Sequence, residues 1–442
     1  MSRLPAQFSF GWPRRAVLAS AIAVAAVLPL AAAVPAGAAS RVAAPAVASP
    51  WASFTLTRAS LTASGGQADG ASFFASIAGN GGHVVFRTNA RNVWPDSMTV
   101  VRDRATGRLT PVTLTKDGKP SGFGQVIRSS ISADGRYVAF CSMANDLVPG
   151  QPPYEFAIRV FVRDTRTGTT VLASVDENGR QFTYDSAPPV LSADGRSVAF
   201  ISGGQVYVRD LAAGRTVKAS IPPAGENWWY GSSWGFPSLS ADGRKVAFAR
   251  NPGGGSDVVV YVRDLVAGTT VPASVNRNGA TVYAVSDSPA LSADGRYVTF
   301  ASSAPDIVPG DAGPKTQVYR RDLATRRNVR ISVSPAGAPG NEGSLGATIS
   351  GNGRYVAFVS LADNLVAGDT DALRDVFVRD VDAGTTTRVS VTADGNPPDQ
   401  VSQYLQAVIA DNGRSVLFQS SATNLVAGDT NGAEDVFIAD VR

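Results

Sequence analysis

The chain has 442 residues, of which 44% are hydrophobic and 17% are charged, and it contains 44 glycines and 27 prolines. This composition excludes an intrinsically disordered chain and is typical of a folded protein with many turns. The formal net charge is +4, but residues 1–39 supply three arginines and no acid, so the remainder carries +1 and offers no basic run for nucleic acid.

Residues 1–39 have the pattern of a secretory signal peptide. Two arginines precede the apolar run AVLASAIAVAAVLPLAAAV, which is followed by small residues and an Ala-x-Ala site. We predict cleavage near Ala38 or Ala39 and a secreted, extracellular or cell-envelope location. The arginine pair leaves both the general and the twin-arginine export routes open. An uncleaved anchor helix is the alternative, and no second apolar stretch of about 20 residues follows to span a membrane.

Beyond residue 54, one phrase recurs seven times in forms such as SADGRYVAF. Asp-Gly and Asn-Gly are the strongest short hairpin signals, so each copy predicts two antiparallel strands joined by a tight turn. The repeat distance of 48 to 60 residues is that of a complete structural unit. The turn residues are Asn80, Asp134, Asp194, Asp242, Asp294, Asn352 and Asn412.

A second phrase, typified by VYVRD, follows each copy and predicts a third strand. In five of the seven units a glycine lies four residues after its Asp, which suits a tight turn into a fourth, β-branched strand. Four antiparallel strands repeated at this period indicate a propeller. We therefore predict an all-β fold, a seven-bladed β-propeller over 54–442, preceded by a flexible linker at 40–53.

The last unit stops at Arg442, directly after its third strand. Its missing strand is expected at the other end of the propeller, because FTLTRASLTASGG at 54–66 matches the fourth-strand phrase TTRVSVTADG at 386–395. We predict that residues 55–63 form the outer strand of the last blade. This arrangement closes the ring with sequence from both ends and leaves no broken edge.

The phrases S-A-D-G-R-x-V-A-F and V-[YF]-V-R-D-L resemble the WD40-like (PD40) repeats in the propeller of the TolB family. The match covers essentially all of residues 54–442. The resemblance implies the fold and says little about function. We expect no counterpart of the N-terminal domain of TolB, because the signal and Phe54 leave no room for it. The propeller of prolyl oligopeptidases is also similar, without their hydrolase domain.

The connections between the second and third strands, and those between units, are mostly long and are expected on one face of the ring. Long loops on a rigid scaffold are a common place for binding. Aromatic side chains, which give large and stiff contact areas, gather in these loops. We predict a binding role for them, with packing over the blades as the alternative: Trp228, Trp229, Tyr230, Trp234, Tyr283 and Tyr184.

Two of the long loops are acidic, GDTDALRD and GDTNGAED. Calcium takes several oxygen ligands from a short loop of this kind, so calcium is the candidate cofactor. The alternative is that these side chains cap their own turns through hydrogen bonds. The candidate ligands are Asp369, Asp371, Asp375, Asp429, Asn431 and Asp435.

The single histidine, His83, rules out a multi-histidine metal site and is expected to be structural. No G-x-S-x-G nucleophile motif occurs. The leading hypothesis is a secreted, monomeric, non-enzymatic propeller that recognises a protein or a polysaccharide at its loop-rich face. The alternative is a secreted carbohydrate-active enzyme that uses carboxylates at the channel mouth, with or without calcium. A third hypothesis is a ring whose role is assembly at the cell surface.

Overall fold

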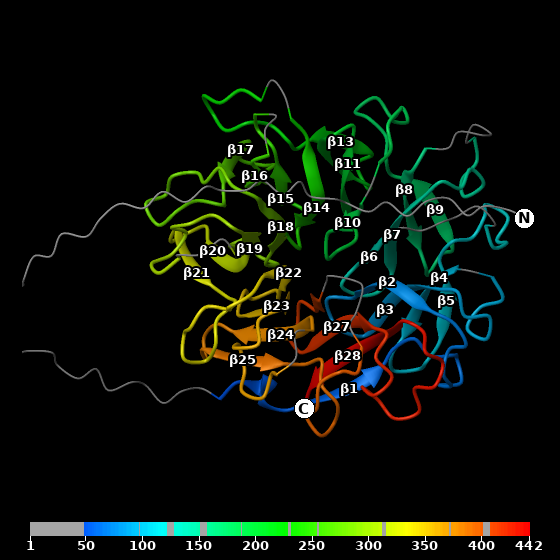
Figure 1. Ribbon diagram of the computed structural model, residues 1–442. Coiled ribbons are helices and arrows are strands. Elements are labelled where there is room, and N and C mark those ends of the chain that lie inside the picture. The colour runs from blue at the N-terminus through cyan, green and yellow to red at the C-terminus, as the bar shows by residue number, and fades with distance from the viewer. Residues whose placement is uncertain are drawn as a thin grey trace, which may run out of the picture. The chain divides into compact units, whose positions relative to one another are not determined.

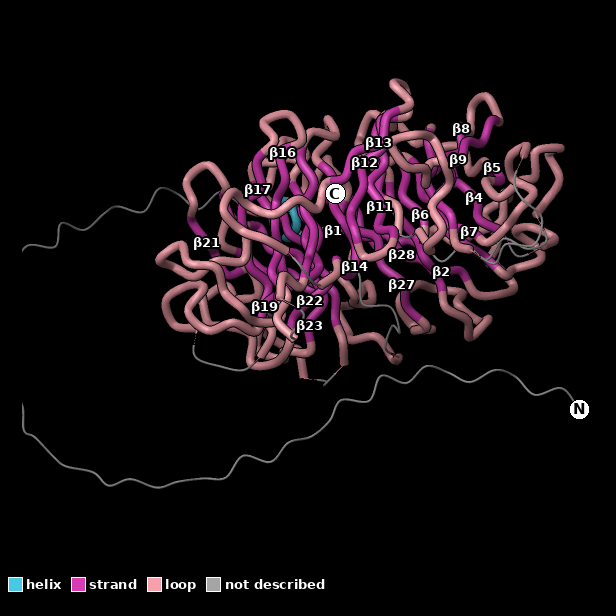
Figure 2. Tube along the Cα trace, turned by 90° about the horizontal axis from the view of Figure 1, so that it is seen from above, coloured by secondary structure: helices cyan, strands magenta, loops and turns pink. Residues whose placement is uncertain are grey.

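The computed structural model describes residues 48–96, 98–121, 128–150, 157–186, 188–228, 231–253, 256–311, 315–370, 373–400 and 407–442. These residues form seven four-stranded antiparallel sheets, the blades of a β-propeller (Figure 1). This confirms the predicted fold. Within the described residues the only helical turn is η1 (Pro50–Ala52), and strands and loops make up the rest (Figure 2). None of the described helices is long and apolar enough to cross a membrane.

The strands of each blade are named a to d from the inside outward. Blade 1 holds β2 (Ser72–Ile77), β3 (His83–Thr88), β4 (Met98–Asp103) and β5 (Leu109–Pro111); blade 2 holds β6 (Ser129–Ile131), β7 (Tyr137–Ser142), β8 (Arg159–Asp164) and β9 (Thr169–Leu172). Blade 3 holds β10 (Val190–Leu191), β11 (Ser197–Ser202), β12 (Gln205–Asp210) and β13 (Arg215–Lys218); blade 4 holds β14 (Ser233–Leu239), β15 (Lys245–Arg250), β16 (Val259–Asp264) and β17 (Thr269–Pro272). Blade 5 holds β18 (Ser286–Leu291), β19 (Tyr297–Ser302), β20 (Gln317–Asp322) and β21 (Arg327–Arg330); blade 6 holds β22 (Ser344–Ile349), β23 (Tyr355–Ser360), β24 (Asp375–Asp380) and β25 (Thr385–Arg388). Blade 7 holds β26 (Val408–Ile409), β27 (Ser415–Ser420), β28 (Asp435–Val441) and β1 (Phe54–Arg58).

Blade 7 is completed by the N-terminal strand, as the sequence predicts. Strand β1 pairs antiparallel with β28 in a register that runs from Phe54 opposite Val441 to Arg58 opposite Phe437. The pairing therefore begins one residue before the predicted segment and ends five residues before its end. A closed ring leaves blade 7 with the same four strands as the other blades and exposes no extra edge.

Aromatic pairs from strands b and c fill the space between blades. In six of the seven blades a Phe of strand b stacks on the Phe or Tyr directly opposite it, with ring centroids 5.6 to 6.0 Å apart. Such cross-strand aromatic pairs stabilise a sheet beyond the apolar area that they bury. The rings are those of Phe140 and Phe161, Phe200 and Tyr207, Phe248 and Tyr261, Phe300 and Tyr319, Phe358 and Phe377, and Phe418 and Phe437.

The Asp-Gly and Asn-Gly turns between strands a and b are packing sites as well as turns. Gly135 has a φ of +78°, and a Cβ built on it would lie 2.3 Å from Cγ of His83 in blade 1. Gly195 receives Tyr137 of blade 2 in the same way, and Gly353 receives Tyr297 of blade 5. Glycine is needed here both for its left-handed backbone and for its missing side chain. His83 contacts a neighbouring blade, in agreement with a structural role.

A circle of backbone hydrogen bonds joins all seven blades at these turns. Each bond links the turn of one blade to the turn of the next, with N···O distances of 2.8 to 3.1 Å. Because the circle is continuous, every blade is tied to both neighbours by main-chain bonds that do not depend on side-chain identity. The donor and acceptor pairs are Asn80 to Ala133, Ala133 to Ala193, Ala193 to Ala241, Ala241 to Ala293, Ala293 to Gly351, Gly351 to Asp411, and Asn412 to Gly79.

The packed structure extends further toward the N-terminus than Phe54. Trp51, in η1, lies within the segment expected to be a linker, yet its side chain is fully buried in the core of blades 6 and 7. Its indole N–H donates to the carbonyl oxygen of Gly413 at 3.1 Å. The sequence pattern shows only a lone tryptophan before the first strand, and the cavity that receives it exists only once the blades have assembled.

Candidate functional site

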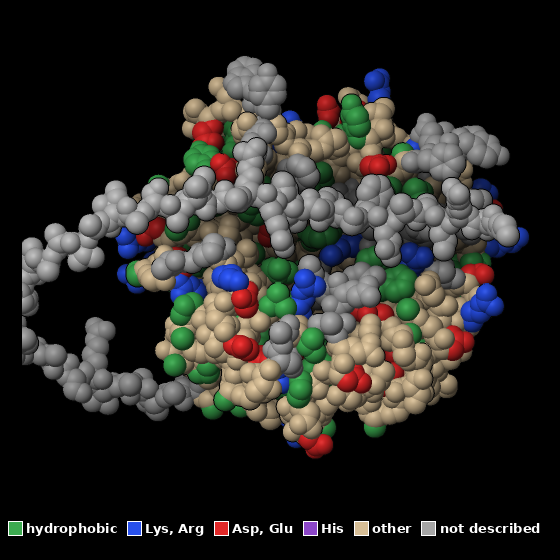
Figure 3. All heavy atoms as spheres, in the orientation of Figure 1, with side chains coloured by type: hydrophobic (Ala, Val, Ile, Leu, Met, Phe, Trp, Pro, Cys, Tyr) green, Lys and Arg blue, Asp and Glu red, His purple; other side chains and the backbone are tan. Residues whose placement is uncertain are grey.

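A cavity of about 520 Å³ lies where the inner strands of the seven blades meet. It is the central channel of the propeller, and Figure 1 shows strands β2, β6, β10, β14, β18 and β22 gathered around it. The lining consists mainly of small and apolar side chains from the a strands. On the face seen in Figure 3, basic and acidic side chains are interspersed and form no patch of a single charge. The channel is therefore the candidate site considered first.

Four of the inner strands bulge where they enter the ring from the loop-rich face. The register of the a–b pairing shifts in β2, β14, β18 and β22. Each shift contains a residue with positive φ: Phe74 at 55°, Gly235 at 67°, Ser288 at 51° and Gly346 at 63°. Left-handed backbone is costly for Phe and Ser, and bulges and strain of this kind occur often at functional sites. The bulges redirect side chains at the loop-side mouth of the channel.

Arg128 reaches across this mouth. It precedes β6 in blade 2, and its guanidinium carbon lies 3.7 Å from the ring centroid of Phe236, which belongs to β14 in blade 4. The contact therefore passes the short inner strand of blade 3. Burial lowers the pKa of Arg128 to about 10. A desolvated guanidinium stacked on an aromatic face is a strong cation–π geometry.

Asp287 is the only acid, and Arg128 the only base, among the described residues that line the channel. Asp287 is exposed to the channel, and partial desolvation by the surrounding protein raises the pKa of its carboxyl group. A hydrogen bond from Ser288 opposes the rise. No Lys, Arg or His of the described ranges forms an ion pair with it. A carboxylate held on a strained bulge without a counter-charge is suited to a ligand group that supplies a proton or a positive charge.

The predicted aromatic cluster is only partly within the described residues. Trp229 and Tyr230 lie outside them, and Trp234 is described only by its backbone, which pairs with Ala249 in blade 4. Tyr184 and Tyr283 are 67% and 62% exposed. They belong to the loops that precede blades 3 and 5, so the structure does not bring these two rings into one blade.

Trp228 packs on the core of blade 4. Its ring lies edge-on to Tyr261 at 4.8 Å and to Phe248 at 6.3 Å, and the guanidinium carbon of Arg250 stands 4.8 Å from its centroid. Phe182 covers the corresponding pair in blade 3, at 4.6 Å from Tyr207. Packing against these residues is sufficient to explain the position of Trp228. Trp228 also contributes to the lining of a small pocket.

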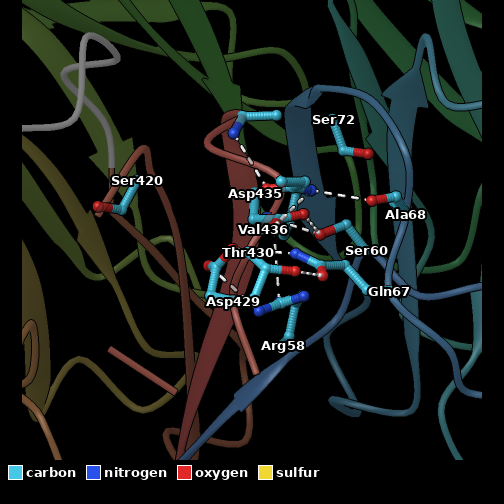
Figure 4. A network of polar contacts seen from close by, with 12 residues as sticks. Arg58, Ser60, Gln67, Ala68, Ser72, Ser420, Asp429, Thr430, Asp435 and Val436 are labelled. Carbon is cyan, nitrogen blue, oxygen red and sulfur yellow. Dashed lines mark hydrogen bonds and ion pairs between the residues drawn. The ribbon is translucent and has the colours of Figure 1, made fainter. Parts of the chain in front are cut away.

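In blade 7 the side chain of Arg58 lies beside the carboxylates of the acidic loop (Figure 4). The Arg58 guanidinium lies 3.1 Å from the carboxylate of Asp429 and 3.5 Å from that of Asp435. Ser60 donates to Asp435, Gln67 donates to Asp429 at 3.0 Å, and the Asn431 amide donates to the carbonyl of Ala68 at 2.9 Å. The loop is thus joined to the N-terminal strand and the segment after it.

The acidic loop of blade 6 has the same arrangement. Arg388 in β25 bonds Asp369 at 2.9 Å and Asp375 at 3.1 Å, and Ser390 donates to Asp375 at 2.6 Å. Asp371 lies outside the described residues. In both loops a buried arginine supplies a positive charge beside the carboxylates that are candidate calcium ligands. The described residues contain no group of three or more acidic, His or Cys side chains placed to hold a metal ion, and calcium binding stays a prediction.

The channel residues were not among the predicted site residues. The available signal was a charge in or directly before an inner strand: Asp287 lies seven residues before the turn residue Asp294, and Arg128 lies six residues before Asp134. Both interrupt segments that otherwise read as apolar or small. The sequence contains no comparable signal for the bulges at Phe74 and Ser288, because a bulge depends on how two strands pair.

Comparison with known proteins adds the fold and nothing finer. No family model matches the chain, and no curated protein matches it. Solved structures similar to it include the β-propeller domain of the Trilobed protease from Pyrococcus furiosus, which has an open velcro topology, at 12% identity and a TM-score of 0.50 over 84% of this chain and 96% of that one. A prolyl endopeptidase is 14% identical with a TM-score of 0.50 over 84% of this chain, which spans half of that enzyme. TolB from Acinetobacter baumannii is 14% identical with a TM-score of 0.40 over 83% of this chain and 78% of that one. At these identities the likeness establishes that the chain shares the β-propeller fold of the peptidase propeller domains.

Proposed function

We propose that this protein is a secreted binding propeller that holds a polysaccharide or a protein segment at the loop-side mouth of its central channel. The observation that carries the proposal is Asp287, an exposed carboxylate that forms no ion pair with a described residue and stands on a bulge lining a cavity of about 520 Å³. Concave sites with a few convergent polar groups on a mostly apolar lining are the usual form of ligand sites.

The surroundings of Asp287 favour a ligand that combines a flat apolar surface with a hydrogen-bond donor. Phe74 and Phe236 offer aromatic area at the same mouth, and Arg128 holds Phe236 in place by stacking on it. A hydroxyl or amino group of the ligand would face the carboxylate. Sugar rings and aromatic or basic amino-acid side chains both satisfy this description.

The channel does not by itself favour catalysis. Hydrolysis by paired carboxylates needs two acids roughly 5 to 10 Å apart. The described lining supplies Asp287 alone, so the proposal is limited to binding.

Export is the second element of the proposal and rests on the sequence of residues 1–39. Expression of the full chain in a bacterial host and mass spectrometry of the protein outside the cytoplasm test it. We expect a mature N-terminus at Ala39 or Ser40. Protein found only with an intact N-terminus would contradict it.

Binding is tested on printed arrays of polysaccharides and of peptides with three variants. Asp287→Asn and Phe236→Ala alter the channel, and Asp117→Asn alters an exposed acid elsewhere. We expect the spots bound by the wild type to lose at least tenfold in apparent affinity with either channel variant and to persist with the control. Binding that is equal in all four proteins would overturn the proposal, as would a wild type that binds no spot on either array.

A further inference from the structure

Blades 5, 6 and 7 share one polar arrangement at the edge where strand b connects to strand c. An Asp from the connecting loop pairs with an Arg near the end of strand d, at 2.9 Å in blade 6 and 3.1 Å in blade 7, and the same two residue types pair in blade 5. A Ser two positions after that Arg donates to the first side chain of strand c. In the order Asp, first residue of strand c, Arg, Ser, the members are Asp311, Gln317, Arg330 and Ser332; Asp369, Asp375, Arg388 and Ser390; and Asp429, Asp435, Arg58 and Ser60.

Blade 3 keeps three of these four positions. Ser220 donates to the side-chain oxygen of Gln205 at 2.9 Å, as Ser332 does to Gln317 in blade 5. Lys218 stands opposite Tyr207 in the strand register, where Arg330 stands opposite Tyr319. The fourth position is missing, because strands b and c of blade 3 are joined by only Gly203 and Gly204. The cation is therefore present without its loop carboxylate.

A pocket of about 280 Å³ lies at this place. It is lined by Gln205, Lys218, Ser220, Pro222, Asn227, Trp228 and Arg250, so it contains two cations and no acid. Among the described residues, neither Lys218 nor Arg250 forms an ion pair. Two unpaired cations beside one pocket attract an anion.

One of the two cations, Arg250, belongs to the neighbouring blade 4 and distinguishes that blade from the others. It ends strand b of blade 4, a position occupied by Ser or Thr in all six other blades. Its side chain is only 2% exposed, and its Nε has no hydrogen-bond partner in the described parts of the chain. One Nη donates to the carbonyl of Gly231 at 2.9 Å, and the guanidinium stands over Trp228. The other Nη donates to the carbonyl of Gly204 at 3.4 Å and to the side-chain oxygen of Gln205 at 3.5 Å, so the guanidinium has no acidic partner. Burial and the charge of Arg250 lower the pKa of Lys218.

We propose that this pocket binds the carboxylate of a ligand, which takes the place of the loop Asp of blades 5, 6 and 7. The remaining lining selects the rest of the ligand. Gln205, Ser220 and Asn227 offer neutral donors and acceptors, and Pro222 and the edge of Trp228 offer apolar surface. Hydroxyl groups on a ring suit the neutral groups, so the carboxylate belongs to an acidic sugar, a uronic acid residue. The site shares no residue with the channel and does not rest on the function proposed for it.

The test measures binding of sodium glucuronate by calorimetry to the protein from residue 40 onward. Methyl glucoside serves as the neutral sugar and N-acetyl-aspartate amide as the acidic peptide mimic. We expect glucuronate to bind at least tenfold more tightly than either, and its affinity to fall as salt is added. Equal or tighter binding of the aspartate mimic would overturn the assignment to a sugar, and no binding of glucuronate would overturn the site.

Variants separate this site from general effects on the fold. Lys218→Met and Arg250→Ser should each weaken glucuronate at least tenfold; serine is the residue that most other blades carry at the latter position, so the blade should still fold. Lys119→Met, at an exposed lysine outside both sites, should leave glucuronate binding unchanged. Retained binding in both pocket variants, with folding verified by circular dichroism, would overturn the proposal.

Discussion

Arg58 and Asp429 come from opposite ends of the propeller sequence, yet their side chains form an ion pair of 3.1 Å in which they are only 6% and 2% exposed. The same guanidinium lies 3.5 Å from Asp435. Strand β1 is thus held to blade 7 by a ladder of main-chain bonds and by a buried charge network (Figure 4). We expect ring closure to depend on both, because removal of the cation leaves two buried acids without a compensating charge.

Replacement of Arg58 by Met should therefore destabilise the propeller strongly. Breaking a buried ion pair by removing one partner typically costs about 3 to 5 kcal/mol. Urea unfolding followed by tryptophan fluorescence measures the loss. Arg327→Met, at an exposed position of β21, is the matched control and should change the free energy of unfolding by less than about 0.5 kcal/mol. Equal stability of the two variants would contradict a role for Arg58 in closure.

Trp51 should contribute as much to closure as the strand that follows it. Trp51→Ala empties a fully buried site between blades 6 and 7 and should cost about 3 to 5 kcal/mol. Trp51→Phe keeps most of the volume and loses the bond to Gly413, so a smaller loss of about 1 kcal/mol is expected. Thermal unfolding of both variants measures the difference. A Trp51→Ala variant with the wild-type melting temperature would show that the ring begins at Phe54.

The stability of the propeller should depend on pH through Asp435. Burial raises the pKa of its carboxyl group from 3.8 to about 6, while hydrogen bonds from Ser60 and the charge of Arg58 act in the opposite direction. The native state then binds more protons than the unfolded state between about pH 4 and 6. The contribution of this group to the free energy of unfolding is therefore largest near pH 4 and falls as pH rises through that window.

Asp435→Asn isolates this effect, because asparagine does not titrate. The free energy of unfolding of the wild type minus that of the variant should decrease from pH 4 to pH 7, by on the order of 2 kcal/mol. Below pH 4 a second group of acids acts with the opposite sign. Salt bridges to Arg136 and Arg296 lower the pKa of Asp164 and Asp322, so the stability that they provide is lost as the pH falls through their lowered pKa values. A difference between wild type and variant that does not change from pH 4 to pH 7 would contradict the assignment to Asp435.

Two glycines with the same backbone conformation should tolerate alanine very differently. Gly135 and Gly118 have φ values of +78° and +75°, but only Gly135 is covered by a neighbouring side chain, that of His83. Gly118→Ala should cost only the left-handed strain, roughly 1 to 2 kcal/mol. Gly135→Ala adds an overlap that costs roughly 1 to 3 kcal/mol more. Urea unfolding of the pair checks the difference, and equal losses would show that contact between blades is unimportant at these turns.

Calcium should have little effect on the wild type. The described aspartates of the two acidic loops are already paired with Arg58 and Arg388, so a cation would have to displace a guanidinium. We expect the melting temperature to be unchanged by a chelator and by millimolar calcium. A calcium-dependent rise would instead support the metal prediction. In that case substitution of Asp371, which is outside the described residues, would be the next experiment.

The sequence by itself determined the architecture of this protein. Seven Asp-Gly or Asn-Gly turns, each followed by a VRD-type strand, predicted seven four-stranded blades, and the likeness of 54–66 to 386–395 predicted which strand closes the ring. These predictions succeed because turns and strand patterns are written in residues that are close together in the chain. The burial of Trp51 was not predicted for the same reason. It depends on blades 6 and 7, which are formed by residues far from Trp51 in the chain.

Only the tertiary structure decided what the polar and aromatic loop residues contact. Asp429 has the composition of a calcium ligand, and only the folded ring shows that Arg58 lies beside it. Trp228 has the composition of a binding residue, and only the packing of blade 4 shows that Tyr261 and Arg250 hold its ring. The sequence pattern does not indicate a role for Asp287, and only the bulge of β18 shows that it lines the channel. In each case the deciding partner comes from another strand or another blade, and a pattern of neighbouring residues contains no information about that distance.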